Sequence, residues 1–183
     1  MQIWAGLGNP GPQYAMHRHN VGFMAVDLLA DMYRFSTPRK QFQGWVQDGR
    51  IGDDKVLLLK PATFMNESGR SIGEAMRFYK LDPGTDLLVL VDDIALSTGM
   101  IRLRGDGGGG GHNGLGDITS KLGGPTWARC RIGIDAPGRI PQKDYVLGRF
   151  TQEQQEDLEP ALEDAVSAVA CWVEHGITTT MNR

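Results

Sequence analysis

Several polar side chains in this sequence could carry acid–base chemistry, and each lies at the end of a predicted element. His19 follows a glycine-rich turn that contains Asn9, and it stands just before the first long helix. Asp92 follows an apolar strand, and Asn113 follows a glycine-rich loop. An imidazole titrates near neutral pH, so His19 is a candidate general base. Asp92 could orient that imidazole, and the amide side chains could bind a polar ligand.

Water is the simplest nucleophile for such a site. No serine or cysteine stands beside His19 or on a sharp strand-to-helix turn, so hydrolysis is the simpler interpretation. Asp92 and Asp93 are neighbours at an extended end and point to opposite faces, so only one of them can face His19. Asn66 has two interpretations: it precedes a helical pattern, so it either caps that helix or serves the site.

The elements that must position these residues follow from hydrophobic periodicity, which predicts alternating strands and helices. Strands are expected at 3–5, 42–51, 55–60, 87–91, 100–104 and 129–134, and helices at 20–33, 66–79, 114–122 and 151–173. A tight turn at 52–54 makes a hairpin of two strands, and Thr151 and Gln154 fit a capping box that opens the last helix. We therefore predict an α/β fold with a mixed sheet in a single domain over residues 1–183.

Two glycine-rich segments resemble nucleotide-binding motifs but lack their mechanical requirements. Residues 6–11 match the dinucleotide pattern G-x-G-x-x-G, yet prolines flank the last glycine and the helix starts only near Asn20. That motif needs a helix that opens inside the glycines. Residues 107–111 are not followed by the Gly-Lys-Ser or Gly-Lys-Thr of a phosphate loop. His17 and His19 have no evident third ligand nearby, so no metal site is predicted.

Composition and charge narrow the function classes. The net charge of −3 argues against a protein that binds polyanions in general, without selectivity. Residues 95–149 nevertheless hold eight basic and four acidic side chains, whereas residues 150–183 hold one basic and seven acidic ones. The basic stretch could hold phosphates, or it could be ordinary solvated charge. The N-terminus lacks the pattern of a signal peptide and the longest apolar run spans 87–91, so a cytoplasmic protein without a membrane segment is expected.

Five motifs, in order along the chain, resemble those of bacterial-type peptidyl-tRNA hydrolase. They are GLGNPG at 6–11 with Tyr14, RHNVG at 18–22, KPATFMNESG at 60–69, LVDD at 90–93 and GGHNGL at 110–115. RIGI at 131–134 and YVLG at 145–148 also fit. The resemblance therefore covers nearly the whole chain at the length typical of the family.

The resemblance implies a single α/β domain with a twisted mixed β-sheet flanked by helices, acting as a monomer without a cofactor. It implies hydrolysis of the ester that joins a peptide to the 3′ ribose of tRNA. His19 would be the general base that activates water, and Asp92 would orient its imidazole. Asn9 would complete the catalytic set. The implied substrate-binding residues are Tyr14, Met65, Asn66, His112 and Asn113, and the implied ligands of the tRNA 5′ phosphate are Arg104 and Arg131.

Some positions depart from the family pattern. Val91 stands where a histidine is common, His17 where a threonine is common, and Ala95 lacks a second carboxylate. Asp135 and Ala136 replace a glycine followed by a basic residue. These departures concern the surroundings of the site and tRNA affinity.

The alternative function, from a different class, is a non-catalytic RNA-binding module that uses the basic segment alone. The polar residues at the strand ends would then have no reason to converge.

Overall fold

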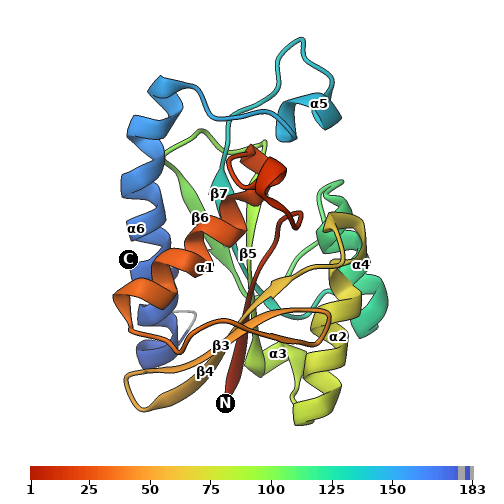
Figure 1. The fold of residues 1–183 in the computed structure, drawn as a ribbon, viewed down its shortest axis with the longest axis vertical. Helices are drawn as coiled ribbons and strands as arrows, with labels where there is room; N and C mark the ends of the chain where they lie inside the picture. The colour runs from red at the N-terminus through yellow and green to blue at the C-terminus, as the bar shows by residue number, and fades with distance from the viewer. Residues whose placement is uncertain (177–179, 182–183) are drawn as a thin grey trace.

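The computed structural model describes residues 1–176 together with 180 and 181, and it is built on one seven-stranded sheet (Figure 1). The strand order is β2-β3-β4-β1-β5-β7-β6. The strands are β1 Gln2–Gly6, β2 Arg39–Gln41, β3 Gly44–Ile51, β4 Asp54–Pro61, β5 Leu87–Asp93, β6 Ile101–Arg104 and β7 Ala128–Gly133. Strands β4, β1, β5 and β7 are parallel, whereas β2, β3 and β6 pair antiparallel. The predicted mixed sheet is thus confirmed.

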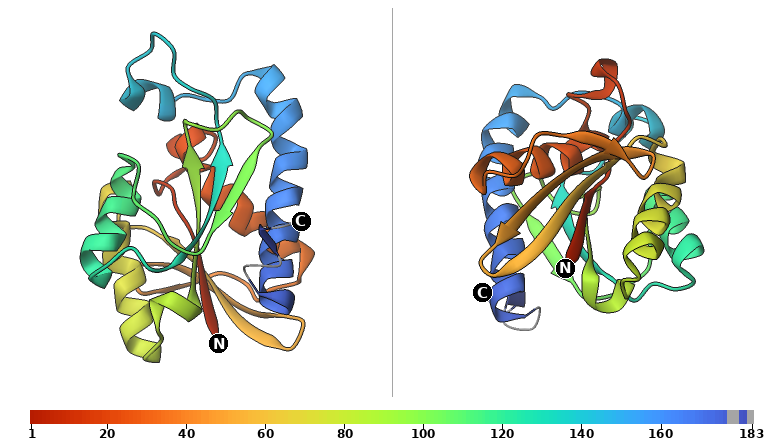
Figure 2. Two further views of the ribbon diagram at one scale, coloured as in Figure 1. Left: turned by 180° about the vertical axis from the view of Figure 1, so that it is seen from behind. Right: turned by 60° about the horizontal axis from the view of Figure 1, so that its bottom comes forward.

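Helices cover both faces of the sheet. Helices α1 (Val21–Met32) and α6 (Gln152–His175) pack on one face, and α2 (Ser68–Tyr79) and α4 (Asn113–Leu122) pack on the other (Figures 1 and 2). Strand β1 is buried between them, with Trp4 facing α1 and α6 and with Ile3 and Ala5 facing α2 and α4. Two hydrophobic layers therefore hold the central strands rigidly.

The start of α1 lies directly on the central strands. A Cβ atom added at Gly22 would lie 2.4 Å from the carbonyl oxygen of Leu90 and 2.5 Å from the backbone nitrogen of Leu7. Only glycine permits this approach. It brings the short 3-10 turn before α1 (Arg18–Asn20) onto the carboxyl ends of β1 and β5, and that turn carries His19.

All predicted strands and helices are present, but some boundaries differ. The strand expected from residue 42 begins at Gly44, because Phe42 and Gln43 have φ angles of 54° and 53° and form a tight turn after β2. The helix expected from Asn66 begins at Ser68. The short elements β2, α3 (Pro83–Asp86) and α5 (Gln142–Val146) were not predicted. The capping box of α6 is confirmed. Within the described ranges, no helix is long and apolar enough to cross a membrane.

Candidate active site

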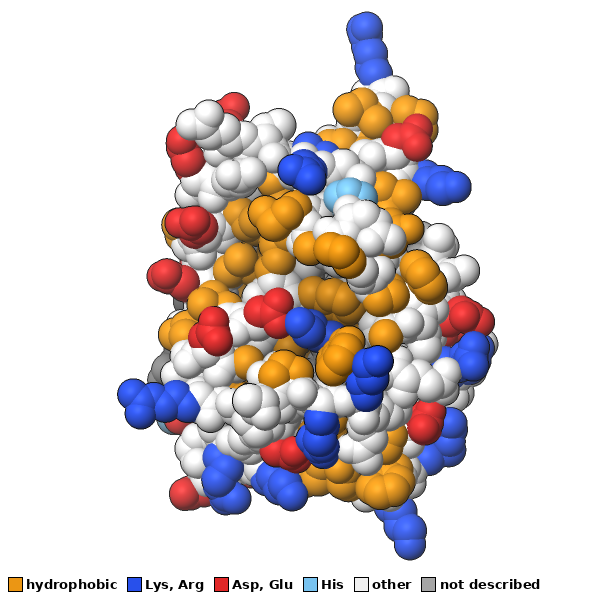
Figure 3. Space-filling view, in the orientation of Figure 1, with side chains coloured by type: hydrophobic (Ala, Val, Ile, Leu, Met, Phe, Trp, Pro, Cys, Tyr) orange, Lys and Arg blue, Asp and Glu red, His pale blue; other side chains and the backbone are white. Residues whose placement is uncertain are grey.

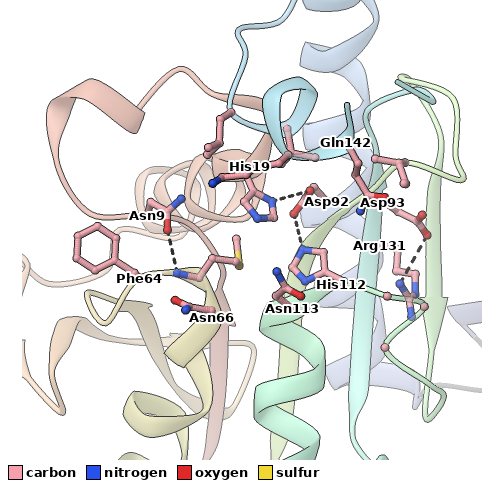
Figure 4. Close-up of a pocket in the computed structure, with 18 residues that line it drawn as sticks. Asn9, His19, Phe64, Asn66, Asp92, Asp93, His112, Asn113, Arg131 and Gln142 are labelled. Carbon is pink, nitrogen blue, oxygen red and sulfur yellow. Dashed lines mark hydrogen bonds and ion pairs between the residues drawn. The ribbon is translucent and has the colours of Figure 1, made fainter. Parts of the chain in front are cut away.

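A pocket of about 560 Å³ opens at the carboxyl edge of the parallel strands (Figure 4). This is the edge where ligands bind in open α/β sheets. Its walls include Asn9, His19, Met65, Asn66, Asp92 and Asn113. These residues come from the loop after β1, the turn before α1, the 3-10 turn Met65–Glu67, the end of β5 and the first residue of α4. The structure therefore brings together polar residues that lie more than a hundred positions apart in the sequence.

His19 and Asp92 form the hydrogen bond on which the pocket is centred. Nδ1 of His19 lies 2.8 Å from Oδ2 of Asp92. The histidine side chain is 14 % exposed and the aspartate 2 %. Since an ionised carboxylate can only accept, Nδ1 of His19 carries the hydrogen. Within the described part of the chain, Nε2 of His19 has no hydrogen-bond partner, so the neutral ring keeps a free acceptor at that atom.

A second imidazole holds the other oxygen of Asp92. Nε2 of His112 lies 2.8 Å from Oδ1 of Asp92. His112 precedes α4, and its Nδ1 accepts the backbone N–H groups of Gly114 and Leu115 at 3.1 and 3.4 Å. Because Nδ1 is the acceptor, the neutral ring must carry its hydrogen on Nε2 and donate it to Asp92. The family resemblance predicts His112 as a substrate-binding residue; in the structure its Nε2 is occupied by Asp92.

Asp92 is buried yet strongly acidic. Burial alone would raise the pKa of its carboxyl group, because it disfavours the charged form. The charges of His112 and His19, when protonated, and the hydrogen bonds from both rings outweigh that effect and hold the pKa well below its usual range. The carboxylate therefore stays ionised at neutral pH, and it can stabilise an imidazolium when His19 takes up a proton.

The side-chain amide of Asn9 has a fixed orientation. Its Oδ1 accepts the backbone N–H of Met65 at 2.8 Å, which leaves its NH₂ group as the end available to a ligand. The backbone of Asn9 is held in turn by the side chain of Asn20, whose Oδ1 accepts the Asn9 N–H at 3.0 Å and whose Nδ2 donates to the Asn9 carbonyl at 2.9 Å. Asn9 therefore presents a hydrogen-bond donor without any need to reorient.

Asn66 and Asn113 are exposed residues at the rim of the same pocket. The capping interpretation of Asn66 is wrong: it lies inside the 3-10 turn, and Glu67 occupies the position before α2 without a side-chain cap. Phe64 precedes this turn with φ 63° and ψ 158°, a region almost confined to glycine that costs about 1–3 kcal/mol for other residues. The strained backbone holds the Phe64 ring at one end of the pocket, where it is 50 % exposed.

Arg131 lies at the opposite end of the pocket from Phe64 (Figure 4). Its Nη2 donates to the carbonyl of Gly108 at 2.7 Å, and its Nη1 lies 3.7 Å from Oδ2 of Asp93. Asp93 therefore contacts Arg131 while Asp92 contacts the histidines, in agreement with the expectation that only one of the two faces His19. Lys143 of α5 also lines the pocket. The pocket therefore has a basic residue, Arg131, at one end and an aromatic ring, Phe64, at the other.

Two residues of the predicted set lie outside the pocket wall. Tyr14 is half-buried and reaches the pocket only through Phe64, against whose ring it packs edge-on with centroids 6.3 Å apart. Arg104 is exposed and pairs across the sheet with Arg129, whereas Arg131 pairs with Arg102. The four arginines share one face of the β6–β7 ladder, because directly paired residues point to the same side. Arg104 and Arg131, the two predicted ligands of the 5′ phosphate, are therefore diagonal neighbours in this ladder.

One ligand atom each from His19, Asp92 and His112 lies within 4.8 Å of the others, close enough to be considered for a metal. Each imidazole nitrogen, however, lies 2.8 Å from its own carboxylate oxygen. A metal ion about 2.1 Å from either nitrogen, in the direction of the hydrogen bond in which the nitrogen lone pair would point, would almost coincide with that oxygen. The arrangement fits a hydrogen-bonded triad, and a metal ion would require the aspartate side chain to move.

The fold and this pocket define an α/β protein whose site can activate water beside a set of amide groups. The family model for peptidyl-tRNA hydrolase matches residues 3–183. Peptidyl-tRNA hydrolase of Erythrobacter litoralis is 54 % identical over 177 residues, which cover 96 % of this chain and 92 % of that protein. The enzyme of Novosphingobium aromaticivorans is 55 % identical over 172 residues, covering 93 % of this chain and 88 % of that protein.

Solved structures agree with these relatives. The crystal structure of peptidyl-tRNA hydrolase from Acinetobacter baumannii superposes with a TM-score of 0.92 at 38 % identity, over 100 % of this chain and 93 % of that one. The chain belongs to the peptidyl-tRNA hydrolase family. The resemblance drawn from the five motifs and the predicted fold class are both confirmed.

The departures from the family pattern leave the triad intact. Val91 is fully buried in the core, and Ala95 is exposed. Asp135 has a φ of 66°, a left-handed conformation that suits the glycine common there and that aspartate tolerates better than most residues. Its carboxylate accepts hydrogen bonds from the Thr98 N–H and the Gln154 side chain, both at 2.8 Å. The side chain of Asp135 therefore stabilises the left-handed backbone conformation at this position.

Two residues that support the site, Asn20 and Arg129, were not predicted from the sequence. Asn20 lies inside the motif RHNVG, but nothing in the sequence indicates that its side-chain amide forms hydrogen bonds with the backbone of Asn9. Arg129 is buried against Trp127, and its Nη1 donates to the carbonyl of Gly107 at 2.6 Å. A fully buried arginine in the β6–β7 ladder could have been suspected only from the apolar residues on both sides of it.

Proposed function

We propose that this protein hydrolyses the ester bond between a peptide and the 3′ ribose of tRNA, releasing free tRNA and the peptide. The observation that carries the proposal is the His19–Asp92 hydrogen bond, which leaves Nε2 of His19 as a free acceptor in the pocket. Family membership supplies the substrate class, since the relatives are named for that reaction.

His19 acts as the general base in the first half of the reaction. Its Nε2 takes a proton from water while the water oxygen attacks the ester carbonyl carbon. Asp92 remains ionised and stabilises the imidazolium that forms. The tetrahedral intermediate then collapses: the bond from carbon to the ribose 3′ oxygen breaks, and the imidazolium returns its proton to that oxygen. No covalent enzyme intermediate is needed.

Amide groups position the substrate and stabilise the negative oxygen of the intermediate. The NH₂ group of Asn9 faces the pocket because Met65 fixes the other end of the amide, so it suits the developing oxyanion. Asn66 and Asn113 bind the peptide main chain, with Met65 forming the apolar wall beside them. Amides can pair with backbone donors and acceptors alike, so they accept peptides of varied sequence.

The basic end of the pocket receives the tRNA. Arg131 lines the pocket and Arg104 lies on the same face of the β6–β7 ladder. We assign both to the 5′ phosphate, for which the planar guanidinium is well suited. Arg131 bonds Gly108 through one N–H of Nη2, so its remaining N–H groups can bind phosphate. A non-catalytic RNA-binding module would not require the polar cluster around Asp92.

We further propose that residues 1–183 act as one domain, as a monomer and without a cofactor, because a single chain supplies every group named above. We assign the protein to the cytoplasm on the ground of its proposed substrate, peptidyl-tRNA. The test is incubation with N-acetyl-aminoacyl-tRNA and, in parallel, with aminoacyl-tRNA bearing a free amine, each with and without EDTA. Release of tRNA from the blocked substrate in EDTA is expected, with little release from the unblocked one. Loss of activity on chelation would contradict the metal-free mechanism.

A further inference from the structure

A second groove begins where the active-site pocket ends, on the far side of Phe64. It has a volume of about 600 Å³, and Phe64 lines both spaces. Its floor is the segment 62–64, and its walls include Trp45 and Gln43 of the β2–β3 hairpin and Arg70 of α2. The hairpin is tied to the floor by a hydrogen bond from the Ala62 N–H to the Gln43 carbonyl at 2.9 Å. The groove is therefore part of the fixed structure.

We propose that this groove binds the part of the nascent peptide that lies furthest from the ester. The inference rests on the proposed function. The polyanionic tRNA belongs at the end of the pocket that holds Arg131, since phosphates bind basic side chains. The ester is cleaved beside His19, in the middle of the pocket. The peptide must then leave toward Phe64, which lies at the opposite end of the pocket from Arg131 (Figure 4) and also lines the groove.

Trp45 provides the apolar contact in this groove. It is 39 % exposed, whereas the other three tryptophans, at positions 4, 127 and 172, are 8 % exposed or less. Lys40 pairs with Trp45 across the hairpin, and its Nζ lies 5.2 Å from the centre of the indole ring. On the face seen in Figure 3, hydrophobic side chains gather in the middle of the molecule with lysine and arginine side chains between them.

The polar residues of the groove suit a peptide of varied sequence. Gln41 Oε1 accepts from Arg39 at 3.0 Å, and Gln43 Nε2 donates to Glu74 at 2.7 Å. The other end of each amide, the Gln41 NH₂ group and the Gln43 oxygen, can pair with main-chain groups. Arg70 is partly neutralised by Glu67, with 3.5 Å between Nη1 and Oε1. Lys40 has no carboxylate partner within 4 Å among the described residues, so an acidic peptide side chain would be favoured near it.

A smaller groove on the other side of Trp45 is less suitable for the peptide. It has a volume of about 210 Å³ and contains the ion pair between Asp27 and Lys60. An apolar side chain entering there would desolvate that pair without replacing its water. Asn9 lines both this smaller groove and the active-site pocket, just as Phe64 lines both the larger groove and the pocket. The groove beyond Phe64 is the larger of the two, so we assign the peptide to it.

The test compares kcat/KM for two substrates with the same residue at the ester: N-acetyl-aminoacyl-tRNA and a hexapeptidyl-tRNA with apolar side chains. The wild type should prefer the longer substrate. Trp45→Ala should lower the ratio of long to short by about 10-fold, as expected for the loss of one buried aromatic contact. Trp45→Phe should retain most of the ratio. Phe78→Ala is the matched control, because Phe78 is 63 % exposed and lines none of the three grooves.

Tryptophan fluorescence gives a second measurement that needs no turnover. A hexapeptide joined by an amide to 3′-amino-3′-deoxyadenosine should protect Trp45 from quenching by acrylamide, and the N-acetyl-aminoacyl analogue should not. An unchanged ratio in Trp45→Ala, an equal fall in Phe78→Ala, or no protection by the long analogue would each overturn the proposal. If the wild type cleaved neither tRNA substrate, the proposed function itself would be refuted.

Discussion

Replacing Asp92 with asparagine tests which atoms donate and which accept in the hydrogen bonds of the active site. Each oxygen of the carboxylate lies 2.8 Å from one imidazole nitrogen. An asparagine offers one oxygen and one NH₂ group, so it can accept from only one of the two histidines. His112 must donate, because Gly114 and Leu115 occupy its other nitrogen. The asparagine oxygen will therefore turn to His112 and its NH₂ group to His19.

This arrangement reverses the tautomer of His19. Its Nδ1 becomes the acceptor and its hydrogen moves to Nε2, which can then no longer take a proton from water. General-base help is typically worth about 10²–10⁴ in rate, or about 3–5 kcal/mol of barrier. We expect kcat of Asp92→Asn to fall by that factor. KM should change little, because Asp92 is only 2 % exposed.

The second histidine supplies an internal control. In the double variant Asp92→Asn/His112→Asn, residue 112 can still cap α4 but is too short to reach residue 92. The amide at 92 is then free to turn its oxygen to His19 and restore the active tautomer. The assay is single-turnover release of tRNA from N-acetyl-aminoacyl-tRNA, with folding checked by circular dichroism. Near-normal turnover in Asp92→Asn, or a double variant no faster than the single one, would refute the reasoning.

The lowered pKa of Asp92 contributes to the free energy of unfolding above the unfolded-state pKa of about 3.9, and this contribution is lost as pH falls through the folded-state pKa. Urea denaturation between pH 6 and pH 2 should therefore show a smaller acid-induced loss of stability in Asp92→Asn than in wild type. Asn66→Ala and Asn113→Ala should each lower kcat/KM by a factor equivalent to about 1–3 kcal/mol without lowering the melting temperature, since both are exposed; a fall in melting temperature would indicate a structural role. Arg131→Ala and Arg104→Ala should raise KM, and reduce its salt dependence, for substrates whose tRNA has a 5′ phosphate. On substrates that lack this phosphate, both variants should have the same KM as the wild type. If the wild type had the same KM for both substrates, the assignment of these arginines to the 5′ phosphate would be wrong.

The long elements of the fold were predictable because their periodicity is strong. The apolar run at β5 and the amphipathic pattern of α1 each match one element over most of its length. Helix α5 has only five residues, too few for a 3.6-residue period to show. The turn at Phe42 and Gln43 has positive φ at both positions without glycine or asparagine. It is held by the tertiary bond from Ala62, and no local sequence signal gives it.

The convergence of the site was predictable, but its internal bonding was not. Asn9, His19 and Asp92 follow or precede elements whose ends meet at one edge of the sheet, so their proximity could be inferred. The bond between His112 and Asp92 depends on how the loop at 105–111 returns to the sheet, and that loop has no regular pattern. The choice for Asn66 between a cap and the pocket depends on a 3-10 turn that displaces the helix start by two residues.

The most direct test of the central claim is the single-turnover rate of His19→Ala on N-acetyl-aminoacyl-tRNA, measured together with its affinity for the substrate. If His19 is the general base, the rate should fall by at least about 10²-fold while substrate binding is retained. A His19→Ala protein that binds and cleaves the substrate at nearly the wild-type rate would contradict the mechanism.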